Sequence, residues 1–115
     1  MLKNYIINVD ILREKINSIN VKQYDNGVEV DIVFTKLGEF ISLNNYTVEI
    51  YYKLPNGNIF SKQCKINNNM AKFIIDTDMT KLAGLIKTEI ILTTIDEEIS
   101  INALSITVEE SLRKK

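Results

Sequence analysis

Residues 27–36, GVEVDIVFTK, decide the fold class. Apolar side chains occupy every second position of this stretch, at Val28, Val30, Ile32 and Phe34. A period of two is typical of a β-strand with one face in a core, because successive side chains of a strand point to opposite faces. The same alternation returns over residues 46–54, so the sequence predicts two half-buried strands.

Turn residues separate the strand-like segments that follow. Residues 55–58, PNGN, predict a hairpin, because Asn-Gly tolerates the positive φ angles of a tight connection. Further strands are expected at residues 5–11, 18–23, 59–66, 70–76, 85–95 and 99–108. The segment 70–76 is apolar enough to predict cover on both faces. The apolar residues after Asp10 also fit a helix, an alternative to the first two strands.

The predicted fold is all-β: an antiparallel β-sandwich of seven to eight strands with Greek-key, immunoglobulin-like connections, forming a single domain over residues 1–115. An up-and-down barrel is the alternative. The exception is residues 76–84, which predict one short helical turn. Asp76 or Asp78 would cap it, and Gly84 would end it in the left-handed conformation.

Composition excludes several function classes. The 115 residues carry a net charge of −1, which disfavours nucleic-acid binding. No apolar run is long enough to cross a membrane, and no signal-peptide pattern begins the chain. The chain has no histidine and one cysteine, so zinc, haem and histidine-based nucleophilic catalysis are not expected.

The remaining chemical candidates favour structural roles. Asp76 with Asp78, and Glu97 with Glu98, are carboxylate pairs at turns, where such groups are commonly solvated. Asp76 and Asp78 have the spacing that begins a calcium loop, but the glycine and glutamate of such a loop are missing. Cys64 is predicted to be a small buried hydrophobe. We therefore expect no enzyme activity, no catalytic residue, no metal and no cofactor.

Several motifs occur in one order over residues 8–112. They are VKQYDNG at 21–27, LNNYTVEI at 43–50, KLPNG at 53–57, TKLAG at 80–84, LIKTEIIL at 85–92, ISIN at 99–102 and VEESL at 108–112. This order resembles the N-terminal domain of upper baseplate proteins in tailed phages of Gram-positive hosts. Asn56, Leu104 and Ile106 depart conservatively from that pattern.

The resemblance implies a β-sandwich that attaches the receptor-binding part of a baseplate to the tail hub, and it implies no catalytic residues. Expected partners are other tail and baseplate proteins of a phage or prophage, in a virion assembled in the bacterial host cytoplasm. The isolated domain should be monomeric or weakly self-associating. The alternative is a carbohydrate-binding or adhesion sandwich of a bacterial cell surface, and a carboxylate enzyme is a third, minor reading.

Exposed aromatic residues are the expected partner contacts. Phe40 and Tyr51 are the candidates, because interface energy concentrates in a few such anchors. Lys62 and Lys65 predict that the strand at 59–66 is a protected edge. Contact is therefore expected through loops and side chains rather than by strand addition, and the nearly uncharged 90–95 should be central or covered.

Chelation tests the metal-free expectation. EDTA should leave the melting temperature unchanged, since a structural metal would stabilise the native state by mass action. Thermal unfolding with and without EDTA measures this, and a large decrease would indicate a calcium site at Asp76 and Asp78.

Overall fold

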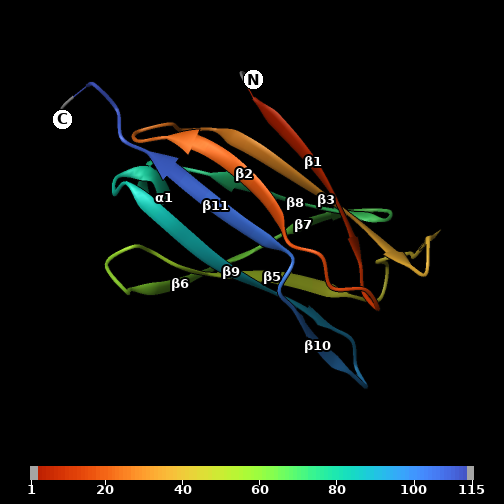
Figure 1. Ribbon diagram of the computed structural model, residues 1–115. Coiled ribbons are helices and arrows are strands. Elements are labelled where there is room, and N and C mark those ends of the chain that lie inside the picture. Colours follow the sequence, from red (N-terminus) through yellow and green to blue (C-terminus); the bar gives the residue numbers. More distant parts are fainter. Residues whose placement is uncertain (1–2, 114–115) are drawn as a thin grey trace.

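The computed structural model describes residues 3–113, which form two β-sheets facing each other (Figure 1). The first sheet has the order β1 (Asn4–Asp10), β3 (Val28–Lys36), β8 (Met70–Ile75) and β7 (Lys65–Asn67), with β4 (Glu39–Phe40) beside β3. The second has the order β2 (Asn17–Lys22), β11 (Leu104–Glu109), β9 (Gly84–Thr93), β5 (Thr47–Lys53) and β6 (Ile59–Gln63), with β10 (Glu98–Ile101) beside β9. The all-β sandwich prediction is confirmed.

The core lies between the inner faces of the two sheets. Alternate residues of the long strands supply it, and its largest fully buried side chains include Ile32, Phe34, Ile50, Ile86, Ile90 and Ile106. Leu43, from the loop between β4 and β5, is also fully buried. The alternation read from residues 27–36 and 46–54 therefore places the core-facing positions correctly.

Two strand pairs are parallel, so the expectation of purely antiparallel sheets is wrong at these places. β1 runs parallel to β3, and β2 runs parallel to β11. The chain leaves the first sheet after β1, forms β2 in the second sheet and returns as β3. The chain reverses its direction each time it crosses between the sheets, so after two crossings β3 runs parallel to β1 beside it.

The strands are shorter and more numerous than the expected seven to eight. The segment 59–66 divides into β6 in the second sheet and β7 in the first, and the chain crosses at the buried Cys64. The segment 99–108 divides into β10 and β11, which pair with opposite ends of β9. Its expected hairpin with 85–95 is confirmed. β9 is a central strand, but Ile95 lies in the turn beyond it and is 98% exposed, so the expectation that 90–95 is central or covered is wrong at this residue.

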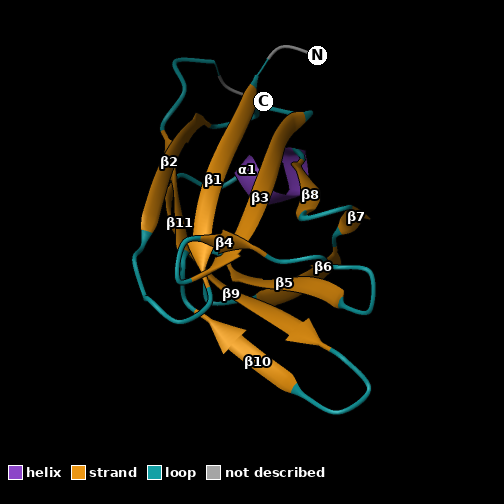
Figure 2. Cartoon of the chain, turned by 90° about the vertical axis from the view of Figure 1, so that its right-hand side faces the viewer, coloured by secondary structure: helices purple, strands orange, loops and turns teal. Residues whose placement is uncertain are grey.

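The expected helical turn is α1 (Thr77–Thr80). The Asp76 carboxylate accepts a bond from the Met79 backbone N–H at 3.2 Å, and the Met79 side chain is fully buried. Gly84 does not end this turn: it begins β9 with φ +134, and the capping position, Lys81, is right-handed. Figure 2 shows α1 behind β3, on the core side of the first sheet.

Burial on the first sheet differs from the expectation in two strands. β8 is not covered on both faces, because Ile74 is exposed. In β3, Asp31 on the outer face is only 6% exposed. Its Oδ2 accepts a hydrogen bond from the Asn4 amide at 3.1 Å. Its Oδ1 has no hydrogen-bond partner among the described residues and lies 3.9 Å from the Lys72 ammonium, whose charge offsets part of the cost of burying the carboxylate.

Gly84 and Gly57 form a matched pair of glycines for testing backbone strain and packing. Both have positive φ, but a Cβ on Gly84 would lie 2.9 Å from Cγ of Pro55, whereas nothing lies within 4 Å of a Cβ on Gly57. Gly84→Ala should destabilise the domain by about 2 to 4 kcal/mol, through strain and overpacking together. Gly57→Ala should cost about 1 to 2 kcal/mol, through strain alone.

Denaturant unfolding of both variants measures the difference. Equal losses would show that Pro55 moves away from Gly84 at little cost.

Candidate functional site

Of the carboxylates singled out in the sequence, Asp76 has structural partners. Asp76 caps α1 and also pairs with the Lys62 ammonium at 2.6 Å. Glu97 lies in the turn of the β9–β10 hairpin, where its backbone N–H donates to the Thr94 hydroxyl at 3.0 Å. Within residues 3–113, no group of three or more potential ligands is placed to hold a metal ion. No helix in that range has the length and apolar character for a membrane span.

Cys64 lies where the chain passes from the second sheet to the first. Its backbone N–H donates to the Val48 carbonyl at 2.8 Å, and its side chain is buried in the core. Burial raises the pKa of the Cys64 thiol to about 12, with a smaller contribution from the charge of Glu49. The thiol therefore stays protonated at neutral pH and acts as a core side chain.

Phe40 lies in β4, at the end of the first sheet where β3 ends, and is 72% exposed. It borders a concave surface with Ile41, Ser42, Asn68 and Asn69. The ring is presented to solvent by a short hairpin whose two strands pair Thr35 with Phe40.

The turn that carries Phe40 has an unusual composition. Leu37 and Gly38 both have positive φ, at 51° and 87°, as a two-residue hairpin turn of the mirror-image kind requires. Asn or Gly normally fills the first position, and a left-handed leucine costs about 1 to 2 kcal/mol. The Leu37 side chain is nevertheless exposed. The hairpin that carries Phe40 thus also exposes the apolar side chain of Leu37.

Asp10 holds this end of the sandwich together. Its carboxylate accepts hydrogen bonds from the Leu12 backbone N–H at 3.0 Å, the Gly38 backbone N–H at 3.0 Å and the Thr35 hydroxyl at 3.3 Å. The Leu12 bond is the main cause that lowers the pKa of Asp10, and the Gly38, Leu37 and Thr35 bonds act in the same direction. One carboxylate therefore joins the β1–β2 loop, with exposed Leu12, to the turn of Leu37.

Tyr51 lies on the outer face of the second sheet, in β5, and is 41% exposed. Its neighbours across the strands are Ser61 of β6 and Glu89 of β9. The carboxylate of Glu49 is the main cause that raises the pKa of Tyr51, with smaller effects from burial, Glu98 and Glu89. A hydrogen bond to the Glu49 carboxylate acts in the same direction, so the hydroxyl stays protonated.

The fold places the two predicted contact residues on different surfaces. Phe40 belongs to the first sheet and Tyr51 to the second. Tyr51 borders a shallow groove of about 360 Å³ with Lys53, Ile59, Lys87 and Asn102. Phe40 and Tyr51 line separate concave surfaces.

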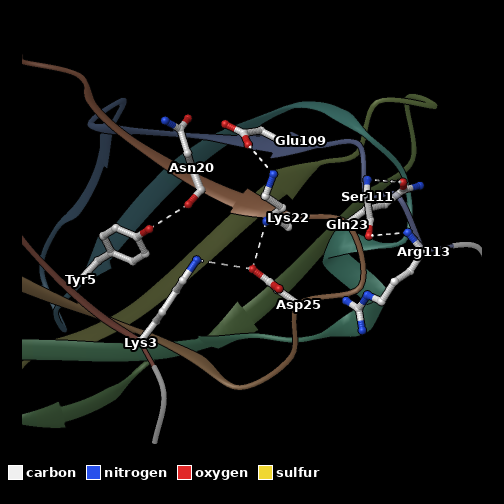
Figure 3. A network of polar contacts seen from close by, with 9 residues as sticks. All are labelled: Lys3, Tyr5, Asn20, Lys22, Gln23, Asp25, Glu109, Ser111 and Arg113. Atoms are coloured by element: carbon white, nitrogen blue, oxygen red, sulfur yellow. Dashed lines mark hydrogen bonds and ion pairs between the residues drawn. The ribbon is translucent and has the colours of Figure 1, made fainter.

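A polar network fixes the opposite end, where the described chain begins and ends (Figure 3). The Gln23 side chain accepts a bond from the Ser111 N–H at 3.2 Å and donates to the Lys81 carbonyl at 2.9 Å. Asp25 accepts a bond from the Lys22 N–H at 3.0 Å and pairs with Lys3 at 3.7 Å. This network orients the segment that leaves β11.

Sequence reasoning missed the apolar residues on β6. Ile59 is 63% exposed and Phe60 is 49% exposed, next to each other on an edge strand. The Phe60 ring centroid lies 6.0 Å from that of Tyr52. The adjacent Ile-Phe pair was the available signal in the sequence, but Lys62 and Lys65 made the strand look protected.

No protein-family model and no curated protein matches this chain by sequence. Among solved structures, the chain is similar to the N-terminal domain of phage TP901-1 ORF48, with a TM-score of 0.73 and 8% sequence identity. The alignment covers 94% of this chain and 99% of that domain. The fold implied by the motif resemblance is thereby confirmed.

Removing the Asp10 charge should loosen the end that presents Phe40. Asp10→Asn should lower the melting temperature at about pH 7, because the amide nitrogen cannot accept the bonds that the carboxylate accepts. Since the folded pKa is lowered, the charge stabilises the fold above the unfolded pKa and this contribution is lost as the pH falls through the folded pKa. Melting of both proteins at about pH 7 and about pH 2.5 should show the difference shrinking in acid. A constant difference would assign the effect to packing.

Proposed function

We propose that this chain is a structural module of a phage or prophage tail baseplate, which connects the receptor-binding apparatus to the tail hub by protein–protein contact. The supporting observation is the shared fold with a phage protein domain over 94% of the chain. The ordered motifs over residues 8–112 support the same assignment independently of the fold. The module belongs to the virion tail and is assembled in the cytoplasm of the bacterial host.

The structure offers two surfaces for such contacts. One end carries Phe40 and Leu37 on the β3–β4 hairpin, whose turn bonds to Asp10. The outer face of the second sheet carries Tyr51, whose side chain is exposed. Aromatic residues of this kind are typical anchors of protein interfaces, because they bury much area at small cost in conformational entropy.

Binding to purified tail-hub and baseplate proteins encoded beside this chain tests the proposal. The wild type should bind at least one of them, and Phe40→Ala or Tyr51→Ala should weaken that binding at least about tenfold, as expected for an interface anchor. Ile74→Ala, on the outer face of the first sheet, is the control and should bind like the wild type.

Binding to a cell-wall glycan with no binding to any tail protein would instead support the adhesion alternative. The groove beside Tyr51, with its lysine, glutamate and asparagine side chains, is where such a glycan would be sought.

A further inference from the structure

β6 is the outer strand of the second sheet, and one side of its backbone is free. It pairs with β5, and no other strand of residues 3–113 pairs with its far side. Two bonds show which residues of this segment turn their backbone groups toward β5. The Leu54 N–H donates to the Asn58 carbonyl at 2.9 Å, and the Cys64 N–H donates to the Val48 carbonyl at 2.8 Å. Because bonded and non-bonded pairs alternate in an antiparallel ladder, the backbone groups of Ile59, Ser61 and Gln63 point outward.

The edge strands on the opposite side of the sandwich, β1 and β2, are joined to each other by side chains. The Tyr5 hydroxyl of β1 donates to the Asn20 carbonyl of β2 at 2.8 Å, and the Asn17 amide donates to the Asn8 carbonyl at 3.3 Å. One carbonyl on each of the facing edges, Asn8 of β1 and Asn20 of β2, thus accepts a bond from a side chain of the other strand. The other strands paired on one side only are shorter than β6, which has five residues: β10 has four, β7 three and β4 two. β6 is therefore the longest edge strand of the described residues that does not face the other sheet's edge.

Lys62 does not protect this edge as the sequence suggested. Its ammonium turns toward the first sheet, where it donates to the Ile74 carbonyl at 2.8 Å and pairs with Asp76 at 2.6 Å. A lysine blocks an edge when its charge would be buried without a partner. Here the Lys62 ammonium already has a partner in the Asp76 carboxylate, so a strand added beside β6 would not bury an unpaired charge.

The side chains of β6 supply apolar contacts on both faces of the edge. Ile59 lies on the outer face, at the groove that Tyr51 borders. Phe60 points to the other face, where it borders a cavity of about 210 Å³ with Tyr52, Leu54, Asp78 and Lys81. Successive side chains of a strand point to opposite faces, so a strand beside β6 would reach the groove and the cavity alternately.

We propose that β6 accepts an extended segment of a partner tail protein, which pairs with the outward backbone groups of Ile59, Ser61 and Gln63. The segment carries neighbouring apolar residues, whose side chains point to opposite faces and pack against Phe60 on one face and Ile59 on the other. Backbone pairing would supply affinity, and the groove and cavity would supply specificity. This inference rests on the proposed function, since the partner is another protein of the same tail.

The test exploits the outward N–H of Ser61. Ser61→Pro removes that donor and keeps the ladder to β5, because proline is tolerated where the N–H faces solvent. It should weaken binding to the tail protein that the wild type binds by at least about tenfold. Ser61→Ala, which loses only the hydroxyl bond to Glu49, should bind like the wild type. Thermal unfolding of each variant verifies that it folds.

A second pair of variants guards against misfolding of Ser61→Pro. Ile59→Lys places a charge on the edge and should weaken binding at least about tenfold. Ile6→Lys places the same charge on β1, at a position 66% exposed against 63% for Ile59, and should leave binding unchanged. In the wild-type complex, hydrogen exchange at the amides of Ile59, Ser61 and Gln63 should slow relative to the free domain.

The outcomes separate the two proposals. Wild-type binding that survives Ser61→Pro and Ile59→Lys, without slowed exchange in β6, would overturn the edge proposal and leave the baseplate role standing. No binding by the wild type to any tail protein would overturn both. A concentration-dependent dimer of the isolated domain with slowed β6 exchange would assign the edge to a second copy instead, which contradicts the proposal.

Discussion

The passage of one continuous segment, residues 59–67, from the second sheet to the first constrains most of the structure. Lys62 fastens this passage, because its ammonium leaves β6 and bonds to the Ile74 carbonyl of β8 and to the carboxylate of Asp76. Both charged groups are partly exposed, so the contact stabilises the fold by about 1 kcal/mol, less than a buried pair of the same geometry would. Its larger effect is positional. Asp76 also caps α1, and α1 places the fully buried Met79, so the position of β6 is coupled to the packing of the core.

Apart from the apolar core and the strand ladders, a few hydrogen bonds join separate parts of the sandwich. The crossing at Cys64 joins the sheets along one side, and bonds from Tyr5 and Asn17 join β1 and β2 along the other. Asp10 fastens the loops at one end, and Gln23 fastens the segment after β11 at the other end. A single polar side chain at each place satisfies backbone groups that would otherwise lack partners. A fold held in this way depends on the alternation of apolar residues and on a few polar positions, which many different sequences can supply.

The sequence allowed prediction of what is local. Strands at residues 27–36 and 46–54, the hairpin at Pro55 and the turn capped by Asp76 all follow from patterns within ten residues. Strand neighbours do not, because alternation looks the same whether the adjacent strand runs parallel or antiparallel; the pairs β1–β3 and β2–β11 could not be deduced. The burial of Asp31 depends on Asn4 and Lys72, which are distant in sequence, and the requirement for glycine at position 84 depends on Pro55. These features arise from tertiary contacts that no short pattern contains.

The candidate contact surfaces, too, could be predicted from the sequence only in part. Composition and local pattern identified Phe40 and Tyr51, and the structure leaves both rings exposed, but only the topology shows that they lie on different surfaces. The free edge of β6 could not be predicted from the sequence either, because only the tertiary structure shows that Lys62, which was expected to protect the edge, bonds to Ile74 and Asp76 instead. An exposed edge carries a risk of unspecific pairing, and the length of β6, five residues, limits that risk. Ile59 and Phe60 restrict it further, because a strand that lacks side chains complementary to both would gain backbone bonds without apolar packing. Five residues therefore suffice for a selective contact only where a partner's side chains match both faces of the edge.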